Sequence, residues 1–211
     1  MKPLSKLVSK PVSSRVDLPR LSALQAPKPP RILDFDLETL AAGFADPNWV
    51  PQKITCAAWS WVGSEKVEGT VSTQAGFFNP ELRVKMLKPL LKAMYEADMV
   101  TGHNIIRFDL PVLNAEVHRL GLPPLKSFLV QDTMKVAKMK GFKKGQDNIS
   151  ELLETVNKKQ AMTWQEWEDA YEEPGWKSII SRAKSDVLQH KEMRQEMLER
   201  GWLKPPAIWK P

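Results

Sequence analysis

The chain has 211 residues, which suits one domain with short extensions. Apolar residues make up 42% and charged residues 27%, which excludes a wholly disordered chain. No apolar run approaches the roughly 20 residues that span a bilayer, and the N-terminus lacks a signal-peptide core, so we expect a cytoplasmic protein with no membrane partner. The single cysteine, Cys56, excludes an internal disulfide and a thiolate metal cage. The formal charge of +6 favours a polyanionic partner.

Three segments differ in composition. Residues 1–30 are rich in proline and basic residues and lack the period of a strand or helix, which predicts a mostly unstructured arm. Residues 31–203 carry the patterns of one folded domain. Residues 204–211 form a Pro-rich tail that cannot continue the preceding helix.

The domain begins with three predicted strands. Residues 32–38 alternate apolar and acidic side chains, which is the period of a strand. Residues 53–62 and 67–74 are rich in β-branched and aromatic types, and the link at 63–66 suits a hairpin. These segments predict an antiparallel meander.

The remainder alternates helices and strands and ends in a helical part. Helices are expected at 81–97, bent or begun at Pro89, and at 111–120, 133–139, 149–156, 163–171 and 175–200, and strands at 99–104 and 128–130. The order predicts an α/β fold with a mixed sheet, in which parallel strands follow the meander.

Acidic residues gather on one face of the first strand. Residues two apart on a strand point to the same side, so Asp34, Asp36 and Glu38 project together. Such carboxylates repel one another unless a cation lies between them, which favours a site for a hard divalent metal. The alternative is a solvated acidic face.

Two further acids carry alternatives of their own. Asp109 falls where a strand ends and a helix begins, a frequent place for active sites, although it could simply cap the helix that starts near Pro111. Capping does not explain Gly102, Asn104 and Phe108 before it. Asp186, taken alone, indicates a solvated acid on the last helix.

Taken together, these segments form a known pattern. Asp36-x-Glu38, then Asn104-x-x-x-Phe108-Asp109, then Asp186 resembles the three motifs of the DEDD superfamily of 3′–5′ exonucleases, the DnaQ-like branch of the ribonuclease H-like fold. The resemblance covers about 31–200 and is greatest to proofreading-type and predicted polymerase-exonuclease members. It implies a ribonuclease H-like mixed sheet flanked by helices.

The resemblance also implies roles for individual residues. The four acids Asp36, Glu38, Asp109 and Asp186 would bind two Mg²⁺ or Mn²⁺ ions that clamp the scissile phosphate. Substrate contacts are implied for Thr39, Asn104 and Phe108. His103 is a candidate for either a substrate contact or a packing role.

The third motif departs from the family. Members carry a tyrosine four residues before the last aspartate, or a histidine five before it, to orient the attacking water, whereas this chain has Arg182 and Ser181. We assign Arg182 to the catalytic site, where it binds the phosphate or pairs with a neighbouring acid. His190, one turn after Asp186, cannot be equated with the family histidine from sequence.

Basic and aromatic side chains lie between the second and third motifs. Lys143 and Lys144 belong to a lysine-rich stretch that is either a solvated surface or a track for the phosphates of a single strand. The tryptophans in the helical region before Asp186 could stack bases, but core packing is the commoner use of such residues.

These features predict a two-metal exonuclease acting on single-stranded or 3′-ended DNA, in replication, repair or phage DNA metabolism, with replication or repair proteins as possible partners. The sequence does not distinguish DNA from RNA as the substrate. The alternatives are a ribonuclease or junction-resolving endonuclease of the same fold, or a nucleic-acid-binding module with weakened turnover.

Overall fold

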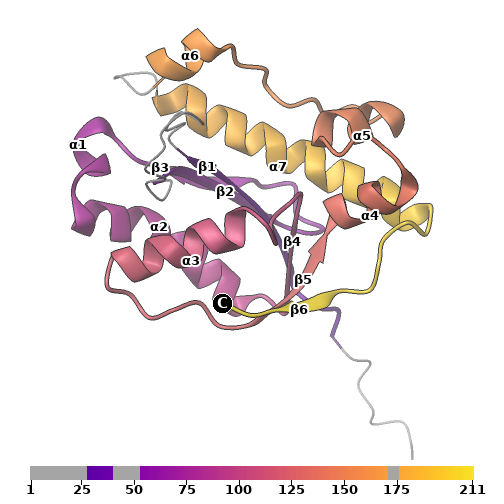
Figure 1. Ribbon diagram of the computed structural model, residues 1–211, viewed down its shortest axis with the longest axis horizontal. Coiled ribbons are helices and arrows are strands. Elements are labelled where there is room, and N and C mark those ends of the chain that lie inside the picture. Colours follow the sequence, from indigo (N-terminus) through magenta and orange to yellow (C-terminus); the bar gives the residue numbers. More distant parts are fainter. Residues whose placement is uncertain (1–27, 40–52, 171–175) are drawn as a thin grey trace, which may run out of the picture.

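The computed structural model describes residues 28–39, 53–170 and 176–211 (Figure 1). A six-stranded sheet has the order β3-β2-β1-β4-β5-β6. The strands are β1 (Ile32–Thr39), β2 (Ile54–Trp61), β3 (Glu68–Val71), β4 (Met99–Gly102), β5 (Phe128–Asp132) and β6 (Ala207–Trp209). The helices are α1 (Gln74–Phe77), α2 (Pro80–Glu96), α3 (Asp109–Arg119), α4 (Thr133–Lys140), α5 (Gln146–Leu152), α6 (Trp164–Asp169) and α7 (Trp176–Glu199).

The sheet is mixed, as the sequence predicts. β1 pairs antiparallel with β2, and β2 with β3, which is the expected meander. β1, β4 and β5 are parallel, and their connections run through helices. The parallel strands therefore end at one edge of the sheet, where the loop after β4 lies close to the start of α4, which directly follows β5.

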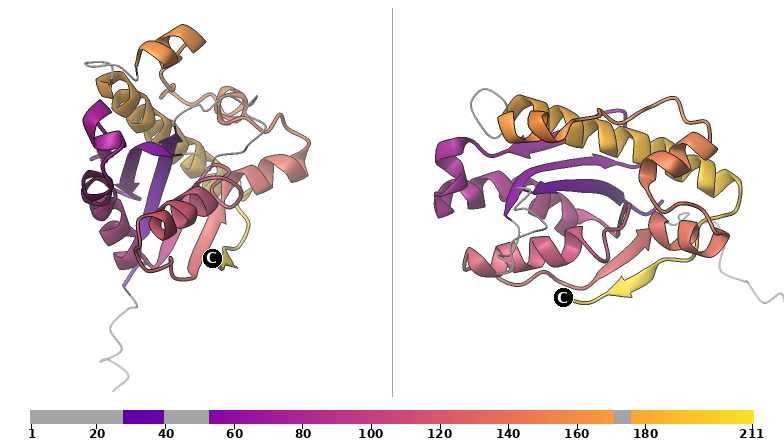
Figure 2. Two further views of the ribbon diagram at one scale, coloured as in Figure 1. Left: turned by 60° about the vertical axis from the view of Figure 1, so that its left-hand side comes forward. Right: turned by 45° about the horizontal axis from the view of Figure 1, so that its top comes forward.

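Helices cover both faces of the sheet (Figure 2). The apolar residues of β1, Leu33, Phe35 and Leu37, are buried in the core under α2 and α3. The alternate residues of β1 face α7, which packs on the opposite side of the sheet. The period of two therefore separates a dry face from an acidic face on the same strand.

A glycine allows β1 and β4 to approach closely. A Cβ atom on Gly102 would lie 2.8 Å from the backbone oxygen of Phe35 and 2.4 Å from Cγ2 of Ile105. The first of these neighbours is main chain and cannot move away cheaply. The glycine at the end of β4, which helix capping did not account for, is thus required by packing.

Some elements differ from those expected. α2 begins at Pro80 and runs through Pro89, whose side of the helix is exposed, so the carbonyl of Lys85 that loses its partner can reach water. α1 is a short helix that the sequence did not indicate. The predicted tail contributes β6, which pairs antiparallel with β5.

The predicted arm at 1–30 falls almost wholly outside the described residues. Within the part of the chain that the structure describes, no helix combines the length and apolarity needed to cross a membrane.

Candidate metal centre

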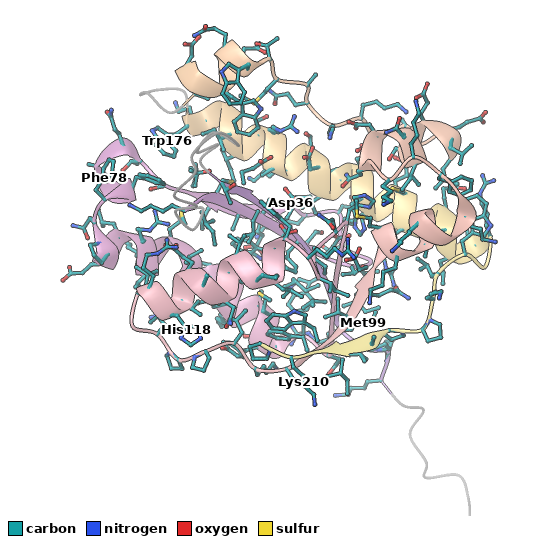
Figure 3. All side chains as sticks on the ribbon, viewed as in Figure 1. Asp36, Phe78, Met99, His118, Trp176 and Lys210 are labelled. Carbon is teal, nitrogen blue, oxygen red and sulfur yellow. The ribbon has the colours of Figure 1, made fainter. Side chains whose placement is uncertain are left out.

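Three carboxylates from two elements converge between the sheet and α7. Asp36 and Glu38 come from β1, and Asp186 comes from α7. One oxygen of each lies within 4.8 Å of the others. Figure 3 labels Asp36 in the middle of the molecule, between α7 and α3 in that view. Segments about 150 residues apart in sequence thus form one acidic cluster.

Apolar packing sets the position of Asp186. Ala183 and Val187, on the same helix, are fully buried against Cys56 and Ala58 of β2. This contact fixes the rotation of α7 about its axis. Asp186 is only 8% exposed, so the alternative of a solvated helix acid is wrong.

The cluster carries negative charge that Arg182 offsets only in part. Burial, and then repulsion from Glu38, Asp109 and Asp186, raise the pKa of Asp36 well above its ordinary value. Burial and the charge of Asp186 raise the pKa of Glu38 to about 8. Burial raises the pKa of Asp186 to about 6. Without a cation, full ionisation of these groups is costly.

The cluster also has free ligand atoms. Oδ2 of Asp36 and Oδ1 of Asp186 are buried and have no hydrogen-bond partner among the described residues. Buried carboxylate oxygens normally have a donor or a metal ion. An oxygen-only donor set suits Mg²⁺ or Mn²⁺, so these residues fit the predicted ions.

Asp109 lies beside this cluster and has a partner of its own. Its Oδ1 accepts a hydrogen bond of 3.0 Å from the backbone N–H of Leu37. Burial raises its pKa to about 7, and its charge in turn raises the pKa values of Asp36 and Glu38. α3 begins at Asp109 with Phe108 at the N-cap and no side-chain capping bond. The carboxylate of Asp109 therefore connects α3 to β1 through Leu37. It does not act as the helix cap that was its alternative role.

Arg182 lies against the acidic cluster. Its Nε donates to Oε1 of Glu38 at 3.2 Å, and its Nη2 is 3.7 Å from Oδ2 of Asp186. Nη1 donates to the carbonyl of Gln160, and the guanidinium lies 5.2 Å from the ring centre of Trp167. Of the two sequence interpretations, ion pairing with a neighbouring acid is the one this geometry displays.

Asp34 shares the acidic face but does not join the cluster. Its Oδ2 lies 2.6 Å from Nδ1 of His190, and both side chains are buried. Of the three acids of β1, Asp36 and Glu38 belong to the acidic cluster, whereas Asp34 pairs with His190.

The loop after β4 is held by Asp132, the last residue of β5, which was not among the predicted site residues. Asp132 accepts hydrogen bonds from the backbone N–H groups of Asn104 and Ile106, and also from that of Met134 in α4. Asn104 has a φ of 66°, a conformation in which asparagine is tolerated. The position of Asp132 at a strand end was the available sequence signal.

A basic cavity of about 180 Å³ lies between this loop and α4. Its lining combines apolar and basic side chains: Asn104, Ile106, Arg107, Asp132, Met134, Lys135, Lys138 and Lys144. Lys144 was a predicted substrate contact, whereas Arg107 was missed. Lys143 is exposed on the adjoining loop but does not line the cavity.

The other predicted contacts lie near the acids or have partners. Thr39 directly follows Glu38 at the end of β1, and Phe108 directly precedes Asp109. Both ring nitrogens of His103 are engaged, Nδ1 with Thr133 and Nε2 with the carbonyl of Lys144. This favours the internal role for His103 over the substrate contact.

The tryptophans divide between surface and core. Trp176 is 5% exposed and packs in the core under α7, whereas Trp164 is 60% exposed.

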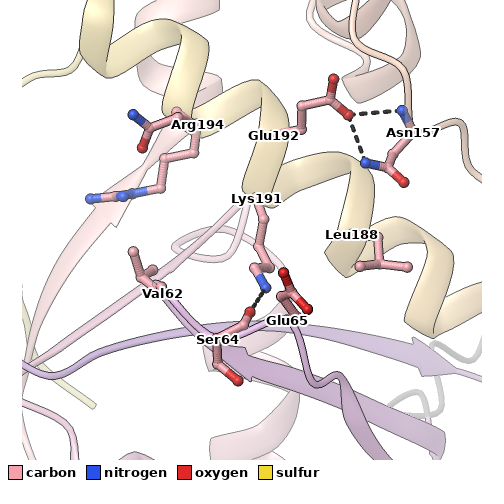
Figure 4. A pocket seen from close by; sticks show the side chains of 10 residues that line it. Val62, Ser64, Glu65, Asn157, Leu188, Lys191, Glu192 and Arg194 are labelled. Atoms are coloured by element: carbon pink, nitrogen blue, oxygen red, sulfur yellow. Dashed lines mark hydrogen bonds between the residues drawn. The ribbon is translucent and has the colours of Figure 1, made fainter.

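A larger cavity, of about 370 Å³, lies between the β2–β3 turn and α7 (Figure 4). Three of its charged side chains already have partners: Lys191 donates to the carbonyl of Ser64, Glu192 accepts from Asn157, and Arg194 donates to Gln131. None of the acids of the cluster lines it. The acidic cluster, rather than this cavity, is therefore the candidate site.

Comparison with known proteins supports the fold. No protein-family model and no curated protein sequence matches the chain. Among solved structures, the family B DNA polymerase from the hyperthermophilic archaeon Pyrobaculum calidifontis matches with a TM-score of 0.57 at 20% identity. The match covers 82% of this chain and 25% of the polymerase chain, so this chain spans a quarter of that protein's length. The shared architecture is compatible with the ribonuclease H-like fold that the sequence resemblance implies.

Proposed function

We propose that the protein is a metal-dependent 3′–5′ exonuclease that hydrolyses DNA. The observation that carries the proposal is the cluster of Asp36, Glu38 and Asp186, whose buried oxygens include two without a hydrogen-bond partner among the described residues. The three acids match positions of the exonuclease motifs. The fold shared with part of a DNA polymerase agrees with a role in nucleic-acid processing.

In this proposal the acids hold Mg²⁺ or Mn²⁺, and Asp109 completes the set from α3. When bound, the ions supply charge neutralisation at the scissile phosphate and activation of the attacking water. The protein contributes a fixed geometry: Asp109 is held by the backbone of Leu37, and Asp186 is held by the packing of α7.

Arg182 has two contributions in the proposal. Its bonds to Glu38 and Asp186 hold two carboxylates in one arrangement. Its guanidinium remains charged at any working pH, so it cannot act as a general base in place of the family's histidine. It acts by positioning and by offsetting charge.

The basic cavity offers a path for the nucleic-acid strand. Arg107, Lys135, Lys138 and Lys144 surround it, and the one acid in its lining, Asp132, is occupied by backbone N–H groups. Cations that follow a groove bind a phosphate backbone without reading its sequence. Ile106 and Met134 supply an apolar surface for a base.

The test is cleavage of 5′-labelled single-stranded DNA and RNA with Mn²⁺ or with EDTA. We expect a ladder that shortens from the 3′ end, only with Mn²⁺, and its loss in Asp36→Asn and Asp186→Asn. Glu151→Gln, at an exposed position of α5, is the matched control and should cleave like the wild type. A single internal cut would indicate an endonuclease, and binding without cleavage would indicate a binding module. Either result would refute the exonuclease.

A further inference from the structure

A chain of side chains in contact connects α7, which carries Asp186 of the acidic cluster, to the basic cavity. Asp34 of β1 contacts His190 of α7 at 2.6 Å, and Nε2 of His190 lies 3.0 Å from the hydroxyl of Thr133. That hydroxyl lies 3.0 Å from Nδ1 of His103, whose Nε2 lies 2.6 Å from the carbonyl of Lys144. We call this chain the His–Thr–His relay.

The relay begins next to the acidic cluster on both β1 and α7. Asp34 is two residues before Asp36 on β1, a rise of about 6.6 Å. His190 is four residues after Asp186 on α7, a rise of about 6 Å. The two spacings match, so Asp186 facing Asp36 and His190 facing Asp34 are successive contacts between the same strand and helix. The relay therefore fixes α7 against β1.

The relay ends at the wall of the basic cavity. His103 directly precedes Asn104, and the carbonyl that it contacts belongs to Lys144; both neighbours line the cavity. Lys144 has an exposed side chain on a loop, so the contact at its carbonyl anchors that side of the wall. Asp132 anchors the opposite side through the backbone of Asn104.

The bonding pattern gives the relay a direction. The carbonyl of Lys144 can only accept, so Nε2 of His103 donates to it. A neutral His103 then accepts at Nδ1 from the hydroxyl of Thr133, which also lies 3.3 Å from the carbonyl oxygen of Gly102. Burial and the charge of His190 lower the pKa of His103 to about 4, which agrees with a neutral ring that donates from Nε2 to Lys144.

We propose that Thr133 is a positioning residue that couples the acidic cluster to the basic cavity. It does so through His190 on one side and His103 on the other. The inference rests on the proposed function, because the cavity is assigned there to the nucleic-acid strand. Thr133 is fully buried at the start of α4 and is itself neither one of the acids of the cluster nor part of the cavity lining, although its chain neighbours Asp132 and Met134 line the cavity. Any effect that the hydroxyl has on ligands must therefore pass through the groups that it contacts.

The test compares Thr133→Val with Thr133→Ser. Valine keeps the shape and removes the hydroxyl, whereas serine keeps the hydroxyl and removes a methyl group, so both variants lose stability but only valine breaks the relay. The measurements are Mn²⁺ affinity by calorimetry and affinity for a single-stranded oligodeoxynucleotide with Ca²⁺ in place of Mn²⁺. We expect Thr133→Val to weaken both affinities about threefold to tenfold, the effect of one lost hydrogen bond, and Thr133→Ser to retain them.

A double-mutant cycle identifies the path. His103→Ala removes the partly exposed end of the relay and remains measurable if Thr133→Val fails to fold. The relay predicts that His103→Ala weakens oligonucleotide binding and that adding it to Thr133→Val causes little further loss. The coupling would be refuted if the fold-losses in oligonucleotide affinity of the two single variants multiplied in the double variant. It would also be refuted if His103→Ala left oligonucleotide affinity unchanged, or if Thr133→Val changed only one of the two affinities. A wild type that binds neither Mn²⁺ nor DNA would instead refute the proposed function.

Discussion

Neutralising one carboxylate of the metal cluster should stabilise the metal-free protein. Glu38 has a pKa raised from 4.5 to about 8, first by burial and then by the charge of Asp186. Each pKa unit corresponds to about 1.4 kcal/mol, so the full shift would amount to about 5 kcal/mol. Glu38→Gln keeps the shape, removes the charge and gives up the ion pair with Arg182. We therefore expect a net gain of about 1–3 kcal/mol at pH 8.

The sign of the pH dependence follows from the direction of the shift. A carboxyl whose pKa is raised on folding stabilises the folded state while it is protonated, and this contribution is lost as the pH rises from 4.5 through about 8. The metal-free wild type should thus lose stability over this range. The advantage of Glu38→Gln should be small at pH 5 and largest at pH 8.

Thermal unfolding in EDTA at pH 5 and pH 8 measures the effect. For a chain of this length, about 2–4 °C in Tm corresponds to each kcal/mol. Glu151→Gln is the control for removing an exposed carboxylate and should change Tm little at either pH. Excess Mn²⁺ should then raise the Tm of the wild type more than that of Glu38→Gln. A lower Tm for the variant at pH 8 in EDTA, or an equal difference at both pH values, would refute the reasoning.

Three further outcomes test the packing and the third motif. Arg83 of α2 and Glu116 of α3 form a buried ion pair, and Glu116 also pairs with the partly exposed Arg119. Arg83→Met should therefore cost about 3 kcal/mol by urea unfolding. Lys92→Met, at the exposed pair with Glu96, should cost under about 1 kcal/mol, and equal losses would contradict the burial argument. Gly102→Ala should cost about 1–3 kcal/mol because its Cβ meets the Phe35 carbonyl, and an unchanged unfolding midpoint would show that the two strands can separate freely. Arg182→Ala should lower the cleavage rate and Arg182→Tyr should recover part of it, whereas a wild-type rate for alanine at saturating and limiting DNA would make the arginine a bystander.

Local periodicity was sufficient to predict strands β1 to β5, the helices other than α1, and the common face of the acids on β1. The spacing of two places Asp36 and Glu38 on one side whatever packs above them, because strand geometry determines it. The period of α7 likewise predicted a long helix through Asp186. The motif order then indicated that these acids meet, and the structure brings Asp36, Glu38 and Asp186 together.

Only the tertiary structure decided which partners the polar groups take. Asp34 has the same spacing as Asp36, yet it bonds to His190, and Arg182 pairs with Glu38 from a segment 144 residues away. β6 forms because Ala207–Trp209 pair with the free edge of β5. The sequence of these three residues, which follow two prolines, does not indicate a strand. Spacing determines neighbours within one element, whereas contacts between elements depend on how the apolar faces pack.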